Sequence, residues 1–219
     1  MNIKYKLCCV FTLSVFIAIF ATSCRKEPKK SFPDYAMFTV VVSTSQGNEI
    51  SSIGYACVYA EKEDVLLLQT AKHLVENKNN KYFITFKSGL SADITAIDFP
   101  DKNKDIAIIQ VKRKLLKNGK DYFVPESPKE ADYKAGLGIY IWRDEYDNNP
   151  VRKIDDVNYQ VPITIFSTAG SIAPGRSGSP VFLKDSKICL GVVSGYFKAD
   201  SAMGEKTICL SYINNEKKL

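Results

Sequence analysis

Short runs of β-branched and aromatic residues recur along this chain between polar turns, and helical periodicity is nearly absent after the apolar N-terminal stretch. Runs of this length and composition predict β-strands. A first series covers residues 37–43, 54–60, 64–69, 82–86, 92–97 and 106–111. A second series covers residues 138–142, 162–166, 180–183, 187–195 and 207–212. The chain is therefore expected to be all-β.

The segment between the two series, residues 112–134, is rich in lysine and carries Pro125 and Pro128, which is typical of a connector. Two groups of short strands on either side of a connector favour two small barrels over one sheet. We therefore expect an N-terminal β-barrel at 36–111 and a C-terminal β-barrel at 135–219. An active site would lie between them.

The N-terminus has the features of an export signal. Lys4 and Lys6 precede an apolar stretch at 7–20, which is shorter than the roughly 20 apolar residues that span a bilayer. The small residues before Cys24 resemble the lipobox of bacterial lipoproteins. This implies a signal peptide at 1–23, lipidation of Cys24, and an anchor and linker at 24–35. An ordinary signal peptide next to an accidental cysteine is the alternative. The lipid would hold the protein at the membrane of the bacterial cell envelope, on the periplasmic face or at the cell surface.

The charge distribution argues against a nucleic-acid partner. The formal net charge is +6, and removal of the leader with Lys4, Lys6 and no acidic residue lowers it to +4. Lysines and acidic residues are mixed throughout, and no basic cluster is interleaved with aromatic side chains. We expect no nucleic-acid binding.

Three of the six cysteines would remain in the exported domain, since two leave with the leader and Cys24 would carry lipid. Cys189 and Cys209 lie in neighbouring strand-like runs, so either a disulfide between them or buried free thiols are compatible with the pattern. The third is Cys57. With no CxxC motif and a single histidine, the chain is expected to bind no metal.

The segment Pro-Gly-Arg-Ser-Gly-Ser-Pro at 174–180 is the strongest chemical feature. Small residues on both sides leave the Ser177 hydroxyl exposed, and glycine admits backbone angles that aim several amides at one point. A serine nucleophile needs a base, and His73 is the only histidine. Asp105 precedes the apolar run 106–109, where a carboxylate can be buried facing the histidine.

Each of these residues stands in its own motif: Thr-Ala-Lys-His ends at His73, Asp-Ile-Ala-Ile begins at Asp105, and Gly-Arg-Ser-Gly-Ser-Pro surrounds Ser177. In this order, over about residues 52–212, the chain resembles the chymotrypsin-like serine peptidases, nearest the bacterial trypsin-like, HtrA-type branch. Two positions depart from the pattern. Ser179 replaces a glycine, and Arg176 stands where asparagine or aspartate is common.

The resemblance implies a fold of two six-stranded antiparallel β-barrels with the active site in the cleft between them. It also implies that Ser177 attacks a peptide carbonyl, that His73 acts as general base and then acid, and that Asp105 orients the ring. The backbone amides of Gly175 and Ser177 would hold the oxyanion. This chemistry requires no cofactor.

The resemblance further assigns a peptide or protein substrate to the strand that carries Ser194, Gly195 and Tyr196, beside which a peptide would add as a strand. Ser194 matches a serine that hydrogen-bonds the catalytic carboxylate. Ser171 matches the floor of the first specificity pocket. Because Ser171 carries no charge and the chain has no second histidine, we expect an uncharged residue before the scissile bond.

The function predicted from the sequence is that of a lipid-anchored, extracytoplasmic serine endopeptidase. The alternative is a catalytically idle lipoprotein of the same fold that binds peptides without cutting them. A third hypothesis, a non-enzymatic β-sandwich lipoprotein, accounts for the leader and the strands but treats the three motifs as accidents.

Overall fold

The structure is a computed structural model that describes residues 34–46, 49–114, 116–142, 151–198 and 204–213. The predicted signal peptide at 1–23, Cys24, and nearly all of the predicted anchor and linker at 24–35 lie outside the described residues. Among the described helices, none has the length and apolar character needed to cross a bilayer.

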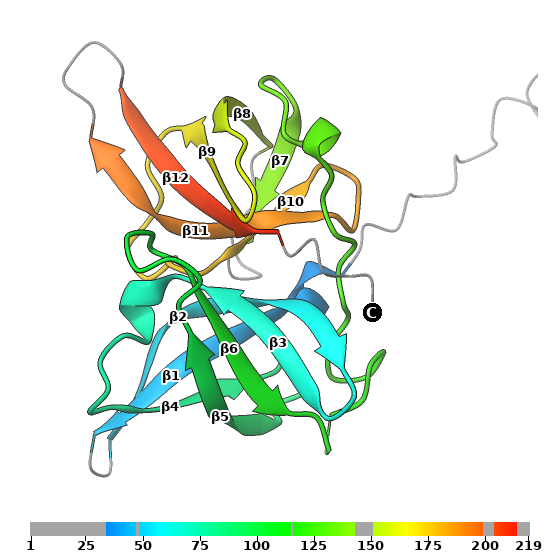
Figure 1. Cartoon of the computed structure of the whole chain (residues 1–219), viewed down its shortest axis with the longest axis vertical. Helices are drawn as coiled ribbons and strands as arrows, with labels where there is room; N and C mark the ends of the chain where they lie inside the picture. Colours follow the sequence, from blue (N-terminus) through cyan, green and yellow to red (C-terminus); the bar gives the residue numbers. More distant parts are fainter. Residues whose placement is uncertain (1–33, 47–48, 115, 143–150, 199–203, 214–219) are drawn as a thin grey trace, which may run out of the picture. The chain divides into compact units, whose positions relative to one another are not determined.

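Two closed barrels make up the described chain (Figure 1). The first contains β1 (Thr39–Gln46), β2 (Glu49–Lys62), β3 (Val65–Thr70), β4 (Lys81–Thr85), β5 (Ser91–Asp98) and β6 (Ala107–Lys112) in the order β1-β2-β3-β6-β5-β4. The second contains β7 (Gly138–Ile141), β8 (Arg152–Asn158), β9 (Ile163–Ala169), β10 (Pro180–Leu183), β11 (Cys189–Lys198) and β12 (Glu205–Tyr212) in the order β10-β11-β12-β9-β8-β7. All pairings are antiparallel. The predicted all-β fold of two six-stranded barrels is confirmed.

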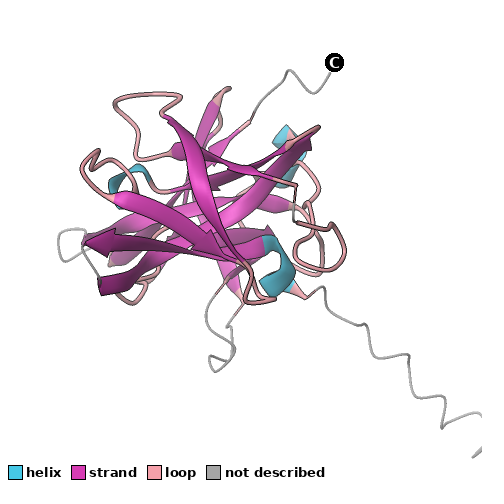
Figure 2. Cartoon of the chain, turned by 90° about the horizontal axis from the view of Figure 1, so that it is seen from below, coloured by secondary structure: helices cyan, strands magenta, loops and turns pink. Residues whose placement is uncertain are grey.

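Helical structure in the described residues is limited to three short 3₁₀ segments (Figure 2). They are η1 (Tyr35–Phe38), η2 (Lys72–Leu74) and η3 (Glu130–Asp132). The strand-like patterns therefore account for almost all regular structure, with one exception.

Strand β8 was missed by the sequence analysis because its residues carry no alternating apolar pattern. Only Ile154 is buried among them, and the register with β9 shifts between Ile154 and Val157. Such a β-bulge places two residues of one strand opposite one of its partner and breaks the period of two. The sequence of β8 therefore contains no simple strand signal.

Each barrel encloses its own apolar core. Val42, Ile84 and Ile109 are fully buried inside the first barrel. Ile139 and Phe166 are buried inside the second. Closing the sheets removes the exposed edges that an open antiparallel sheet would have. The two cores hold the strands in place, and the residues of the candidate site lie at and near the ends of these strands.

A third apolar cluster joins the two barrels. It consists of Phe38, Cys57, Phe182, Cys189 and Val192. The rings of Phe38 and Phe182 lie 5.5 Å apart between centroids, in a tilted arrangement that aromatic pairs favour. The barrels therefore meet through a packed contact between η1 and β2 on one side and β10 and β11 on the other.

In this structure the three described cysteines are buried thiols, and the disulfide between Cys189 and Cys209 is not formed. Strands β11 and β12 do pair, but Cys209 lies opposite Val193, four residues beyond Cys189. The neighbour of Cys189 is instead Cys57, with 3.2 Å between the Sγ atoms.

Candidate active site

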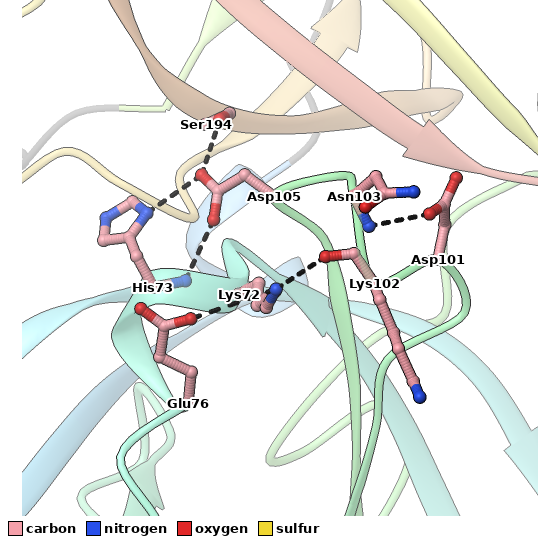
Figure 3. A network of polar contacts seen from close by, with 8 residues as sticks. All are labelled: Lys72, His73, Glu76, Asp101, Lys102, Asn103, Asp105 and Ser194. Carbon is pink, nitrogen blue, oxygen red and sulfur yellow. Dashed lines mark hydrogen bonds and ion pairs between the residues drawn. The ribbon is translucent and has the colours of Figure 1, made fainter.

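His73 and Asp105 meet where two neighbouring strands end and begin. The ring Nδ1 of His73 lies 2.9 Å from Asp105 Oδ2, and the His73 backbone amide donates to Asp105 Oδ1, also at 2.9 Å (Figure 3). Strands β3 and β6 pair Thr70 with Ala107. His73 follows Thr70 by three residues and Asp105 precedes Ala107 by two, so the register of the barrel brings the two side chains together.

A residue of the second barrel completes the environment of the carboxylate. Ser194 in β11 donates its hydroxyl to Asp105 Oδ2 at 2.6 Å (Figure 3). The register between β11 and β12 shifts between Val193 and Gly195, so Ser194 lies at a bulge. Bulges re-aim side chains, and here the side chain is aimed across the interface at Asp105.

These contacts shift the pKa values of Asp105 and His73 in the directions expected of an ion pair. Burial alone would raise the pKa of Asp105, but hydrogen bonds from the His73 ring, the Ser194 hydroxyl and the His73 amide outweigh it and lower that pKa. The hydrogen bond to Asp105 raises the pKa of His73, against partial burial and with help from the charges of Asp105 and Glu76. Asp105 is thus held ionised beside a more basic imidazole.

The loop before Asp105 is held by Lys72, the neighbour of His73. The Lys72 ammonium donates to the Lys102 carbonyl at 2.8 Å, and Asp101 accepts the Asn103 amide at 2.8 Å within the same turn (Figure 3). These bonds connect the segment that carries the carboxylate to the helical turn that carries the histidine.

Ser177 lies in the loop between β9 and β10, and backbone bonds fix that loop against the first barrel. The Tyr55 amide of β2 donates to the Ser177 carbonyl at 2.9 Å. The Tyr55 carbonyl accepts the Thr70 hydroxyl at 2.6 Å. Because Thr70 lies three residues before His73, Tyr55 connects the serine loop to the strand that presents the histidine.

Gly178 makes this close approach possible. Its φ is +77°, and a Cβ there would overlap the Tyr55 carbonyl oxygen and lie 2.6 Å from Thr70 Oγ1. Its amide donates to the Val193 carbonyl at 2.7 Å, next to Ser194. Glycine is required here for conformation and for space.

The backbone amides of Gly175 and Ser177 lie in the loop before β10. In the part of the chain that the structure describes, neither backbone N–H donates to a protein acceptor, and Gly175 adopts a φ of +81° on an exposed turn. The Ser177 hydroxyl likewise has no hydrogen bond to a described residue, His73 included. The structure thus joins His73 to Asp105 directly, and joins Ser177 to them through backbone contacts.

The two-barrel architecture matches a solved structure. The chain aligns with the scabies mite inactivated protease paralogue S-I1 at a TM-score of 0.57 and 19% identity, over 84% of this chain and 93% of that one. The chain has the trypsin fold. No protein-family model matches the chain, and no curated protein matches it with significance. The similarity at this identity concerns the fold alone.

Arg152 is a residue of this trypsin fold that the sequence analysis did not single out. Its guanidinium donates to the carbonyls of Ala169 at 3.1 Å, Gly170 at 3.2 Å and Ser171 at 2.9 Å. These bonds hold the segment that leads to the serine loop and place a positive charge behind Ser171, which is exposed. Because Arg152 lies in the strand that carried no pattern, no local signal pointed to it.

Gly195 and Tyr196 follow Ser194 on β11, where Tyr196 is 57% exposed. Their role in pairing with a substrate peptide stays a prediction. Among the described residues, no group of three or more histidine, cysteine or acidic side chains could hold a metal ion.

Proposed function

We propose that this chain is a serine endopeptidase that cleaves peptide bonds through an acyl-enzyme intermediate on Ser177. The observation that carries the proposal is the contact of one carboxylate with both the ring and the backbone amide of His73, at 2.9 Å each. A base held in one orientation by a third group is what an uncharged serine hydroxyl needs to become a nucleophile.

In this mechanism His73 Nδ1 keeps its hydrogen and donates it in a hydrogen bond to Asp105. The other ring nitrogen, Nε2, is then free to take the proton from Ser177 Oγ. Oγ forms a bond to the substrate carbonyl carbon, and the backbone amides of Gly175 and Ser177 donate to the carbonyl oxygen as negative charge develops on it. His73 Nε2 then returns its proton to the leaving amine. Water repeats the sequence on the acyl group and frees Ser177.

A substrate peptide would lie beside β11 at Ser194, Gly195 and Tyr196 and present an uncharged side chain toward Ser171. The Arg152 guanidinium donates to the Ser171 carbonyl at 2.9 Å. Its positive charge would repel a lysine or arginine side chain of the substrate that points toward Ser171. Chromogenic peptides that differ only in the residue before the cut test this. Faster cleavage after uncharged residues is expected, and selective cleavage after Lys, Arg or Glu would contradict it.

We further propose that a lipid on Cys24 anchors the enzyme in the bacterial cell envelope, outside the cytoplasm. The support is the pattern of small residues before Cys24 that follows the apolar leader. The variant Cys24→Ala should abolish incorporation of a labelled fatty acid in a bacterial host, whereas unchanged incorporation would remove the anchor at Cys24.

The second candidate is a protein of the trypsin fold that binds peptides without cutting them. Two observations favour it: the Ser177 hydroxyl makes no hydrogen bond within the described residues, and one of the solved structures that the chain matches is that of an inactivated paralogue. The first observation has another explanation, because the bond between nucleophile and base is often long before substrate binds and shortens in the complex.

A serine-directed phosphonylating reagent separates the two candidates. The peptidase should be labelled at Ser177, and Ser177→Ala should abolish the label, whereas Ser179→Ala, a matched control two residues away, should keep it. A folded protein that takes no label, or labels equally after Ser177→Ala, would favour the binding protein.

A further inference from the structure

Two buried thiols from different barrels face one another at the interface. Cys57 in β2 and Cys189 in β11 bring their Sγ atoms to 3.2 Å. Both side chains belong to the cluster with Phe38 and Phe182, and their exposed fractions are 0% and 4%. The third described cysteine, Cys209, lies in the separate core of the second barrel.

We propose that Cys57 and Cys189 form a disulfide that links the two barrels when the chain folds in an oxidising environment. A disulfide has an S–S distance of about 2.05 Å, so the observed separation exceeds the bond by only about 1.2 Å. The proposal does not depend on catalysis by Ser177.

The oxidant in this step is an external disulfide, R–S–S–R, on a small molecule or a thiol oxidoreductase. One cysteine, as the thiolate, attacks it, which forms a mixed disulfide and releases one R–SH. The second cysteine attacks the protein sulfur of the mixed disulfide and releases the second R–SH. Two electrons and two protons leave the protein thiols, and two R–SH molecules carry them away.

Burial determines when this exchange happens. It raises the pKa of the Cys57 thiol, and a protonated thiol inside an apolar cluster is a poor nucleophile. The bond is therefore made during folding, before Phe38 and Phe182 close over the pair. Once the cluster is packed, the same burial protects the disulfide from external thiols.

The proposed bond lies beneath the candidate active site. Cys57 follows Tyr55, whose amide holds the Ser177 carbonyl, by two residues, and Cys189 precedes Ser194 on the same strand. The two cysteines are 132 residues apart in the chain. Closing a loop of this length restricts the unfolded chain strongly, so the disulfide should stabilise the docked arrangement of the barrels.

The test is oxidative refolding of the full chain from denaturant with glutathione disulfide, followed by alkylation, unreduced digestion and mass spectrometry. The expected product is a peptide pair joined through Cys57 and Cys189, with Cys209 alkylated. The unfolding midpoint in denaturant should fall when a reductant is added. Cys209→Ala should keep both the linked pair and the effect of the reductant, and Cys57→Ala should lose both.

Natively refolded protein in which Cys57 and Cys189 are both alkylated would overturn the proposal, as would a link that joins Cys209 to either of them. If Cys57→Ala fails to fold, Cys57→Ser and the mapped link in the unmodified chain still decide. An unfolding midpoint that reductant leaves unchanged in the linked protein would remove the stabilising role.

Discussion

The Asp105 carboxylate contacts His73 at two points, through one oxygen to the ring Nδ1 and through the other to the backbone amide, at 2.9 Å each. This double contact fixes the position and the orientation of the imidazole together. Ser194 donates to the same carboxylate from the second barrel at 2.6 Å. The complete arrangement therefore requires that both barrels are folded and docked.

The first prediction concerns the charge of this carboxylate. Asp105→Asn keeps the shape but removes the charge and presents an amide to the histidine, which favours the wrong tautomer. We expect kcat for a chromogenic peptide to fall by about 10³- to 10⁴-fold. Ser194→Ala removes one of three hydrogen bonds and should cost only about 10-fold. Similar losses in both variants, with folding verified by circular dichroism, would contradict this account of Asp105.

The second prediction concerns pH. His73 acts as a base only when neutral, and its pKa is raised above the ordinary 6.5 chiefly by the hydrogen bond to Asp105. Activity should therefore be lost as pH falls through that raised value, and the rising limb of kcat/KM should have its midpoint above pH 6.5. A midpoint at or below 6.5 for the free enzyme would show that the His73–Asp105 bond is absent in solution.

The third prediction concerns the serine loop. In Gly178→Ala the new Cβ would collide with the Tyr55 carbonyl, and the residue would have to keep a φ of +77°. We expect unfolding free energy to fall by about 2 kcal/mol or more and labelling of Ser177 to be lost. Gly195→Ala is the matched control, since no atom lies within 4 Å of a Cβ at Gly195. Its thermal midpoint should stay close to that of the unmodified chain.

The fourth prediction concerns Ser179, the residue that replaces a glycine of the motif. Its hydroxyl is buried with no hydrogen-bond partner among the described residues. Removing an unsatisfied buried hydroxyl should stabilise, so Ser179→Ala should raise unfolding free energy by about 1 kcal/mol. Ser186→Ala removes a hydroxyl that donates to Leu183 at 2.9 Å and should lower it. Destabilisation by Ser179→Ala in denaturant unfolding would mean that the hydroxyl has a partner after all.

The sequence alone predicted those features that leave a local pattern in it. Alternating apolar residues identified nearly all strands, and three short motifs identified His73, Asp105 and Ser177 as candidates. Strand β8 was not predicted, because a bulge between Ile154 and Val157 breaks the alternation of apolar and polar residues. Arg152, which holds the segment at 169–171, was missed with it.

Contacts between the two barrels could not be predicted from local sequence patterns. The bond from Tyr55 to the Ser177 carbonyl and the approach of Cys57 to Cys189 each join residues more than 100 positions apart. Their partners are selected by how the barrels dock. Strand pairing suggested Cys209 as the neighbour of Cys189, but the register places Cys209 opposite Val193.

Cleavage of a peptide library by the purified chain, read by mass spectrometry with Ser177→Ala assayed in parallel, tests the proposed activity most directly. New peptide termini, mostly after uncharged residues, are expected with the unmodified chain, and none with Ser177→Ala. Intact peptides in both reactions, or the same products from both, would contradict it.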